Sequence, residues 1–177
     1  MYVVVDVEAD GPIPGDYSMV SFGAVLVDSA GKLDQTFYSE PLLPISDKYD
    51  PKALAISGYK RDYLELWGLD PKTRMEKFAE WIDMAVPKRP IFISDNNGFD
   101  WSFINWYFHH FIGRNPFGFS SQNLNSLYKG LRRDYYASFK HLRKTRHTHH
   151  PVDDAMGNAE ALLAMLEELK RKDVHAG

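Results

Sequence analysis

Acidic residues gather where apolar segments of this sequence give way to polar ones. Asp6 directly follows the valines at positions 3–5, and Glu8 comes two residues later. Side chains alternate along a strand, so Asp6 and Glu8 lie on one face of the strand that the valines predict. Neighbouring carboxylates repel each other beside a core, and a divalent cation with oxygen ligands offsets that repulsion. The alternative is a strand that has simply surfaced into a polar loop.

Two later segments repeat this order of apolar segment, polar turn and carboxylate. The strand expected at 90–96 leads into SDNNGFD, which places Asp100 in the first turn of a helix. The last helix begins HHPVDDA, with Asp153 and Asp154 in its first turn. Acids are common there as dipole partners, so either position alone is weak support. Carboxylates delivered by two strand ends and two helix starts are a stronger pattern, and we expect the fold to bring them together.

Composition sets the class of protein. A chain of 177 residues with 44% hydrophobic residues predicts one packed domain over residues 1–177. The absence of cysteine excludes disulfides, thiolate metal sites and a cysteine nucleophile. The first strand begins too early for a signal peptide, and no apolar run approaches the ~18 residues of a membrane span. We therefore expect a soluble, cytoplasmic protein with no membrane partner.

The elements that must position the acids follow from periodicity and turn chemistry. Strands are expected at 2–6, 19–27, 33–39 and 90–96, with a hairpin turn at 28–32. Helices are expected at 51–59, after the cap Asp70, at 99–112, near 121–131 and at 152–172, with a loop at 113–123. This order predicts an α/β fold in which helices flank a mixed sheet.

Three stretches together resemble the motifs of the DEDDh, or DnaQ-like, 3′–5′ exonucleases, a family with a ribonuclease H-like fold. They are VVVDVEADGP, SDNNGFDWSFINWYF and HHPVDDAMGNAEALL, and they occur in family order across residues 3–166. The resemblance implies that two divalent cations, Mg²⁺ or Mn²⁺, are held by four acids and used in phosphodiester hydrolysis. The catalytic residues that it implies are Asp6, Glu8, Asp100, His149 and Asp154.

The third motif selects among three histidines. The family places its histidine five positions before the last aspartate, and this spacing joins only His149 to Asp154. The tyrosine subclass has its tyrosine four positions before that aspartate, where His150 stands here. His149 is therefore the expected general base, since its unperturbed pKa lies near the operating pH.

The first two motifs also depart from the family pattern. Asp95 replaces the usual histidine before Asn96, and Ala9-Asp10 replaces a usual pair of threonines. In the family these positions lie near the terminal nucleotide of the substrate. Asp10 and Asp95 are thus expected to add negative charge there, which leaves the choice of substrate open. Asn96 matches the family pattern and is expected to contact substrate.

A basic tract precedes the expected catalytic histidine. Residues 129–146 hold seven Lys or Arg against one acid, although the whole chain has a net charge of −3. We expect a phosphate-binding rim here, with contacts from Arg143, Lys144 and Arg146, rather than only a solvated face. The interleaved aromatics are Tyr135, Tyr136 and Phe139, which either stack on unpaired bases or belong to the core.

These observations predict a metal-dependent 3′–5′ exonuclease that releases nucleoside 5′-monophosphates from single-stranded DNA or RNA. One alternative is a non-catalytic nucleic-acid-binding module on the same fold, and another is a two-metal phosphodiesterase that acts on small dinucleotides. The resemblance is also compatible with a homodimer, for which Phe117 and Phe119 in an exposed-looking loop give weak support.

Overall fold

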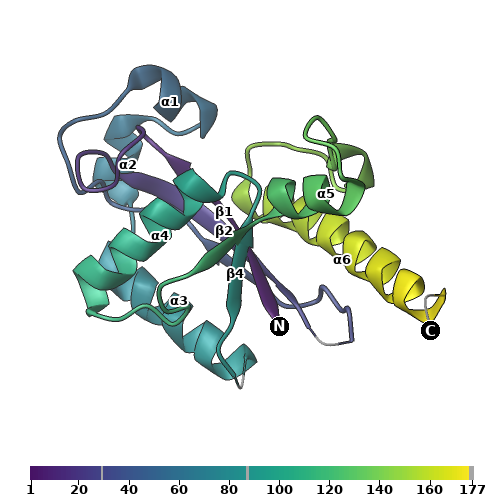
Figure 1. Ribbon diagram of the computed structural model, residues 1–177. Coiled ribbons are helices and arrows are strands. Elements are labelled where there is room, and N and C mark those ends of the chain that lie inside the picture. Colours follow the sequence, from purple (N-terminus) through teal and green to yellow (C-terminus); the bar gives the residue numbers. More distant parts are fainter. Residues whose placement is uncertain (29, 87, 176–177) are drawn as a thin grey trace.

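The computed structural model describes residues 1–28, 30–86 and 88–175, with side chains described as far as Arg171. Within these residues a five-stranded sheet has the order β3-β2-β1-β4-β5 (Figure 1). Its strands are β1 (Tyr2–Ala9), β2 (Met19–Val27), β3 (Thr36–Ser39), β4 (Ile91–Ser94) and β5 (Ser121–Asn123). β1 and β3 are antiparallel to β2, whereas β4 is parallel to both β1 and β5. The predicted mixed sheet is confirmed.

Helices cover both faces of this sheet. They are α1 (Pro51–Ile56), α2 (Arg61–Trp67), α3 (Pro71–Ala85), α4 (Asn97–Ile112), α5 (Leu124–Arg132), the 3₁₀ turn η1 (Lys140–Leu142) and α6 (Pro151–His175). Figure 1 shows α3 and α4 on one side of the sheet and α5 and α6 on the other. No helix in the described part of the chain is both long enough and apolar enough to cross a bilayer.

The side chains of β1 alternate between the two faces of the sheet and pack into two separate cores. Val3, Val5 and Val7 join the core formed with α3 and α4. Val4 faces the other way and joins the core formed with α6. Asp6 and Glu8 share the parity of Val4, so β1 presents both carboxylates on the side of α6.

Gly23 allows α6 to begin directly against the sheet. It pairs with Asp6 in the register of β1 and β2. A Cβ atom at this position would lie 2.5 Å from the main-chain carbon of Pro151 and from the main-chain nitrogen of Val152. Only a residue without a side chain fits there, so the first turn of α6 lies next to Asp6.

Several element bounds differ from those that the sequence predicts. β1 continues to Ala9, so Asp6 and Glu8 lie within the strand and not beyond its end. β5 occupies part of the expected loop at 113–123, and α2 was not expected at all. α2 begins at Arg61, and the side chain of the preceding Lys60 caps nothing, so the start of this helix carries no sequence signal. By contrast, the predicted cap Asp70 accepts the Thr73 N–H at 2.8 Å.

The two phenylalanines that gave weak support to a homodimer lie in different environments. Phe117 is only 1% exposed and packs in the core with α3 and α4. Phe119 is 88% exposed, with the Arg89 guanidinium over its ring. The expectation that both are exposed is wrong for Phe117, because its ring fills space between Phe92 and Phe108.

Candidate active site

The predicted acids meet at the carboxyl-terminal end of β1. Asp6 and Glu8 offer carboxylate oxygens that lie within 4.8 Å of each other and of an oxygen of Asp154, from the first turn of α6. Asp100 approaches from the first turn of α4, where its Oδ1 accepts the Val7 N–H at 3.2 Å. One strand and two helix starts therefore deliver four carboxylates to one region.

Burial and mutual repulsion raise the pKa of three of these acids. Burial is the largest cause of a pKa of Asp6 well above its usual value, and the neighbouring acids add to it, Asp100 and Asp154 first. Burial and Asp154 raise the pKa of Glu8 to about 7. Burial also raises the pKa of Asp100 well above its usual value, although the nearby Ser94 hydroxyl and the Val7 N–H oppose this. The cluster therefore disfavours its own ionised state.

These acids fit a divalent cation. The Oδ2 atom of Asp100 is buried and makes no hydrogen bond to any residue that the structure describes. Oxygen-rich, negatively charged sites are those that hard cations such as Mg²⁺ and Mn²⁺ prefer. A bound cation would also offset the repulsion that raises these pKa values. Asp6, Glu8 and Asp154, with Asp100 beside them, are the residues that could hold it.

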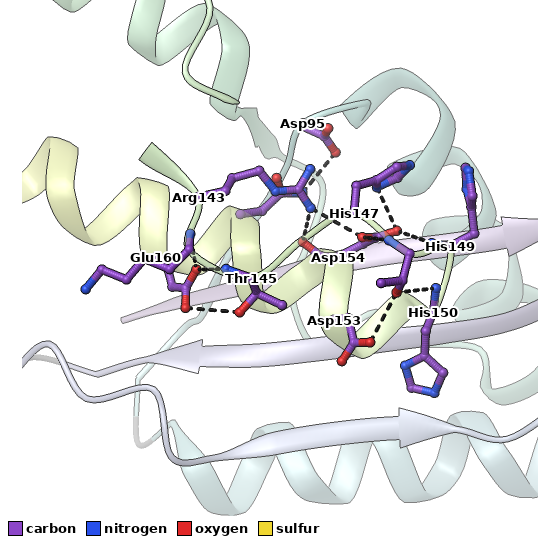
Figure 2. Close-up of polar contacts among 12 residues, drawn as sticks. Asp95, Arg143, Thr145, His147, His149, His150, Asp153, Asp154 and Glu160 are labelled. Atoms are coloured by element: carbon purple, nitrogen blue, oxygen red, sulfur yellow. Dashed lines mark hydrogen bonds and ion pairs between the residues drawn. The ribbon is translucent and has the colours of Figure 1, made fainter. Parts of the chain in front are cut away.

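His149 lies above this cluster because Asp154 anchors its backbone. The carboxylate of Asp154 accepts the N–H groups of Thr148 and His149, both at 3.0 Å (Figure 2). His149 adopts a left-handed φ of 61°, a conformation that non-glycine residues seldom adopt. Its ring is half-exposed, with Nδ1 3.8 Å from Oε1 of Glu8. Spacing predicted that His149 and Asp154 act together, and the structure brings them together.

His150 points away from the acids. Its ring lies on the other side of the chain from the rings of His147 and His149 in Figure 2. It packs against Tyr38 with ring centroids 4.8 Å apart. The register that the third motif predicts thus separates two adjacent histidines into two environments.

His147 contacts Asp154 more closely than His149 does, and sequence reasoning did not single it out. Its Nδ1 lies 2.8 Å from Oδ2 of Asp154. His147 lies in the loop before α6, two residues before His149, whose φ is left-handed. No spacing rule signals this contact, because it depends on the conformation of a loop.

Glu160 holds the start of this loop, which sequence reasoning also missed. Its carboxylate accepts the Lys144 N–H at 2.7 Å, the Thr145 N–H at 2.8 Å and the Thr145 hydroxyl at 3.1 Å. Glu160 and Asp154 lie on α6, so one helix fixes both ends of the segment that carries the histidines.

Arg143 is not available for the phosphate contact that the sequence predicted. Its side chain is only 8% exposed, and it donates to the main-chain oxygen of Asp154 at 2.9 Å. Gly157 makes room for it, since a Cβ atom there would lie 2.5 Å from Nε of Arg143. The guanidinium is thus packed on α6, whereas Lys144 and Arg146 remain exposed.

The two acids that depart from the family pattern have different surroundings. Asp10 is fully buried, where it forms an ion pair with Arg61 at 3.2 Å and accepts the Ser18 N–H at 2.6 Å. The expectation that Asp10 adds charge near the substrate is therefore wrong, because α2 supplies a cation that neutralises it. Asp95 lies close enough to help raise the pKa of Asp6, and its Oδ1 accepts an N–H from Asn158 at 3.0 Å. Asn96 is exposed beside it, just before α4.

A cavity of about 350 Å³ adjoins the acids. Glu8 and Gly11 form one wall, Asp50 and Ile56 of the α1 segment form another, and Phe99 of α4 closes it. Its lining is mostly apolar, which suits a nucleobase and its sugar.

Known proteins resemble this chain in sequence and in fold. No protein-family model matches the chain. The chain is 37% identical over 184 residues to the 3′–5′ DNA exonuclease Cap18 of Escherichia coli, which covers 97% of this chain and 94% of that protein. The chain belongs to the DEDDh 3′–5′ exonuclease family. This exonuclease therefore hydrolyses nucleic acid from the 3′ end.

Solved structures agree with this on the fold. The nuclease domain of 3′hExo, a DEDDh family member bound to rAMP, superposes with a TM-score of 0.74 at 14% identity, covering 94% of this chain and 92% of that one. Cell-death related nuclease 4 gives 0.75 at 15% identity, covering 94% of this chain and 64% of that one. Exonuclease I of E. coli in complex with a dT13 oligonucleotide superposes with a TM-score of 0.65 at 19% identity, covering 96% of this chain and 40% of that one. The predicted ribonuclease H-like fold is confirmed for this exonuclease.

Proposed function

We propose that this exonuclease removes nucleoside 5′-monophosphates one at a time from the 3′ end of single-stranded DNA. The observation that carries the chemistry is the meeting of Asp154 with Asp6 and Glu8, directly below the ring of His149. The choice of DNA rests on Cap18, which is a DNA exonuclease. Two cations of the Mg²⁺ or Mn²⁺ type, held by Asp6, Glu8, Asp100 and Asp154, lower the pKa of water and stabilise charge on the phosphate when bound.

The side chains of the site divide the remaining work. His149 accepts the proton of the attacking water, and its half-exposed ring can reach substrate from the loop. The N–H bonds from Thr148 and His149 to Asp154 hold that ring over Glu8. The cavity between Glu8, Ile56 and Phe99 receives the terminal nucleoside. Asn96 contacts the substrate from the exposed turn before α4.

The nucleotides upstream of the DNA 3′ end bind along the basic tract, residues 129–146. The structure separates the three aromatics of this tract, because Phe139 is buried while Tyr135 and Tyr136 are 88% and 96% exposed. Lys129, Arg133 and Tyr135 line a further cavity of about 600 Å³. Exposed aromatics beside cations suit unpaired bases and their phosphates. We assign this surface, with Lys144 and Arg146, to the nucleotides upstream of the scissile bond.

Trimming of a 5′-labelled oligonucleotide tests the proposed reaction. With Mg²⁺ or Mn²⁺ the wild type is expected to give a ladder that shortens from the 3′ end, faster on DNA than on matched RNA. Asp154→Asn should abolish the ladder, because Asn offers a weaker ligand, while the circular dichroism spectrum stays folded. Binding without shortening, or trimming by Asp154→Asn at the wild-type rate, would contradict the proposal.

Salt dependence tests the upstream surface. Each lost phosphate contact flattens the dependence of log affinity on log salt by roughly 0.7 for a single strand. Lys144→Ala with Arg146→Ala should therefore flatten it by about 1.4. Lys72→Ala, an exposed cation on α3, is the matched control and should leave the slope unchanged. If the salt dependence of affinity is unchanged in the double variant as well, the tract does not contact phosphates and is only a solvated surface.

A further inference from the structure

A second group of metal-ligand atoms shares Asp154 with the acid cluster. Atoms of His147, His149 and Asp154 all lie within 4.8 Å of one another. The two imidazoles are half-exposed at 53% and 49%, with ring centroids 4.3 Å apart. Asp154 is buried beneath them at 1% exposure. The group thus combines one buried carboxylate with two imidazole rings that are open to solvent.

We propose that His147, His149 and Asp154 bind a transition-metal ion of the Zn²⁺ type, and that this ion inhibits the exonuclease. Imidazole nitrogens suit zinc, copper and nickel, whereas Mg²⁺ prefers oxygen. Zinc ligand atoms lie about 2.0–2.2 Å from the metal, so atoms already within 4.8 Å of one another need only small ring rotations to close around an ion. Two histidines and one carboxylate leave the fourth tetrahedral position open to water.

The close contact between His147 and Asp154 marks the place of the ion. Nδ1 of His147 lies 2.8 Å from Oδ2 of Asp154. An ion that binds between these two atoms displaces any proton held there, because metal ligands must be deprotonated. The N–H bonds from Thr148 and His149 hold the carboxylate in place meanwhile. Figure 2 shows the rings of His147 and His149 on the same side of Asp154.

Inhibition follows from the two shared residues and rests on the proposed function. With zinc bound, His149 no longer accepts a proton, and Asp154 has one oxygen engaged away from Asp6 and Glu8. The two metal groups therefore compete: cations of the Mg²⁺ type support trimming, and zinc opposes it. His147 is the residue of the second group that has no role in the proposed reaction.

Metal binding is tested first without substrate. Metal-free wild-type protein titrated with Co²⁺, a spectroscopic substitute for zinc, should develop the intense visible absorption of tetrahedral coordination. Excess Zn²⁺ should abolish it. His147→Asn should weaken Zn²⁺ binding by more than about tenfold, since even outer ligand partners are worth that much. His150→Asn is the matched control and should bind as the wild type does, because His150 packs on Tyr38 instead.

Inhibition is tested by titrating Zn²⁺ into trimming reactions at fixed Mg²⁺, with each variant normalised to its own zinc-free rate. His147→Asn should need more than about tenfold more Zn²⁺ for half-inhibition, and His150→Asn should not differ from wild type. Equal Zn²⁺ binding by His147→Asn and wild type would overturn the site. Weaker binding with unchanged inhibition would overturn the inhibitory role. If no variant trims even without zinc, the proposed function fails, while the cobalt titration still decides the site.

Discussion

Asp154 is the residue on which the active site depends most. One oxygen of its carboxylate accepts the Thr148 N–H, and the other accepts the His149 N–H and contacts His147. The same side chain reaches Asp6 and Glu8. It therefore fixes the position of the histidine loop relative to the acids, in addition to its own proposed role as a metal ligand.

Two adjacent histidines offer a matched test of the general base. His149→Ala should lower the single-turnover trimming rate by about 10²–10⁴-fold, the usual contribution of such a group. Affinity for Mn²⁺ should survive, because the four carboxylates remain. His150→Ala should lower the rate far less, since its ring packs on Tyr38 and not over Glu8. Rapid-quench assays on a short oligonucleotide measure both rates.

Two results would contradict the assignment of His149 as the general base. If His150→Ala is the slower enzyme, the assigned register of the third motif is wrong. If neither variant slows trimming, no histidine of this loop acts as the base.

At the scale of elements, the contact between β2 and the start of α6 sets the geometry of the site. Gly23 lies opposite Asp6 on the neighbouring strand and directly beneath the main chain of Pro151 and Val152. Asp154 follows three residues after Pro151, in the same first turn. The distance between the β1 acids and Asp154 thus depends on the absence of a side chain at position 23.

Gly23→Ala is expected to impair catalysis through position alone. The new methyl group forces the start of α6 away from the sheet, and misplacement by about 1 Å costs roughly 10²-fold in rate. Overpacking should also lower the free energy of unfolding by about 1–3 kcal/mol. Gly130→Ala on α5 is the control, because nothing lies within 4 Å of its added Cβ. Trimming rates and urea unfolding measure the two effects, and a wild-type rate in Gly23→Ala would show that the close approach is not needed.

At the scale of the molecule, the fold concentrates buried negative charge at one end of the sheet. The pKa of Asp6, Glu8 and Asp100 all rise because these acids are buried near each other. One further buried acid, Asp10, is instead paired with Arg61 of α2. Asp154 also has a cationic partner, since Arg143 lies 3.4 Å from its carboxylate. The molecule therefore leaves Asp6, Glu8 and Asp100 to be balanced by protons or cations.

The stability of the metal-free protein should fall as pH rises. Glu8 has an ordinary pKa of 4.5 that the fold raises to about 7, so between these values the folded chain keeps a proton that the unfolded chain releases. Its stabilising contribution is complete below pH 4.5 and lost above pH 7. This amounts to at most about 3 kcal/mol, and Asp6 and Asp100 act in the same direction.

Urea unfolding in EDTA from pH 5 to pH 8 measures this trend. Glu8→Gln should flatten the pH dependence, whereas Glu76→Gln on the exposed face of α3 should not. Added Mn²⁺ should restore stability most at high pH, because it binds the ionised acids. Metal-free protein that grows more stable towards pH 8 would contradict the assignment of these acids as a strained, buried cluster.

Local sequence features predicted most of the strands, the long helices and the acids that the fold brings together. β-branched runs, the cap at Asp70 and the five-position spacing of His149 and Asp154 are local features, and local backbone preferences carry them into the structure. β5 and α2 are not predicted, because β5 forms through its pairing with β4 and α2 begins without a side-chain cap.

The ion pairs and directions of the other charged side chains depend on tertiary packing. Arg61 reaches Asp10 across 51 positions of sequence and neutralises it. Arg143 turns inward because Gly157 leaves space on α6, and His147 contacts Asp154 from the loop before that helix. A composition of basic and acidic residues does not reveal which charges pair, since pairing depends on which elements pack together. The sequence therefore identified the chemistry, and packing decided which charged groups are left to perform it.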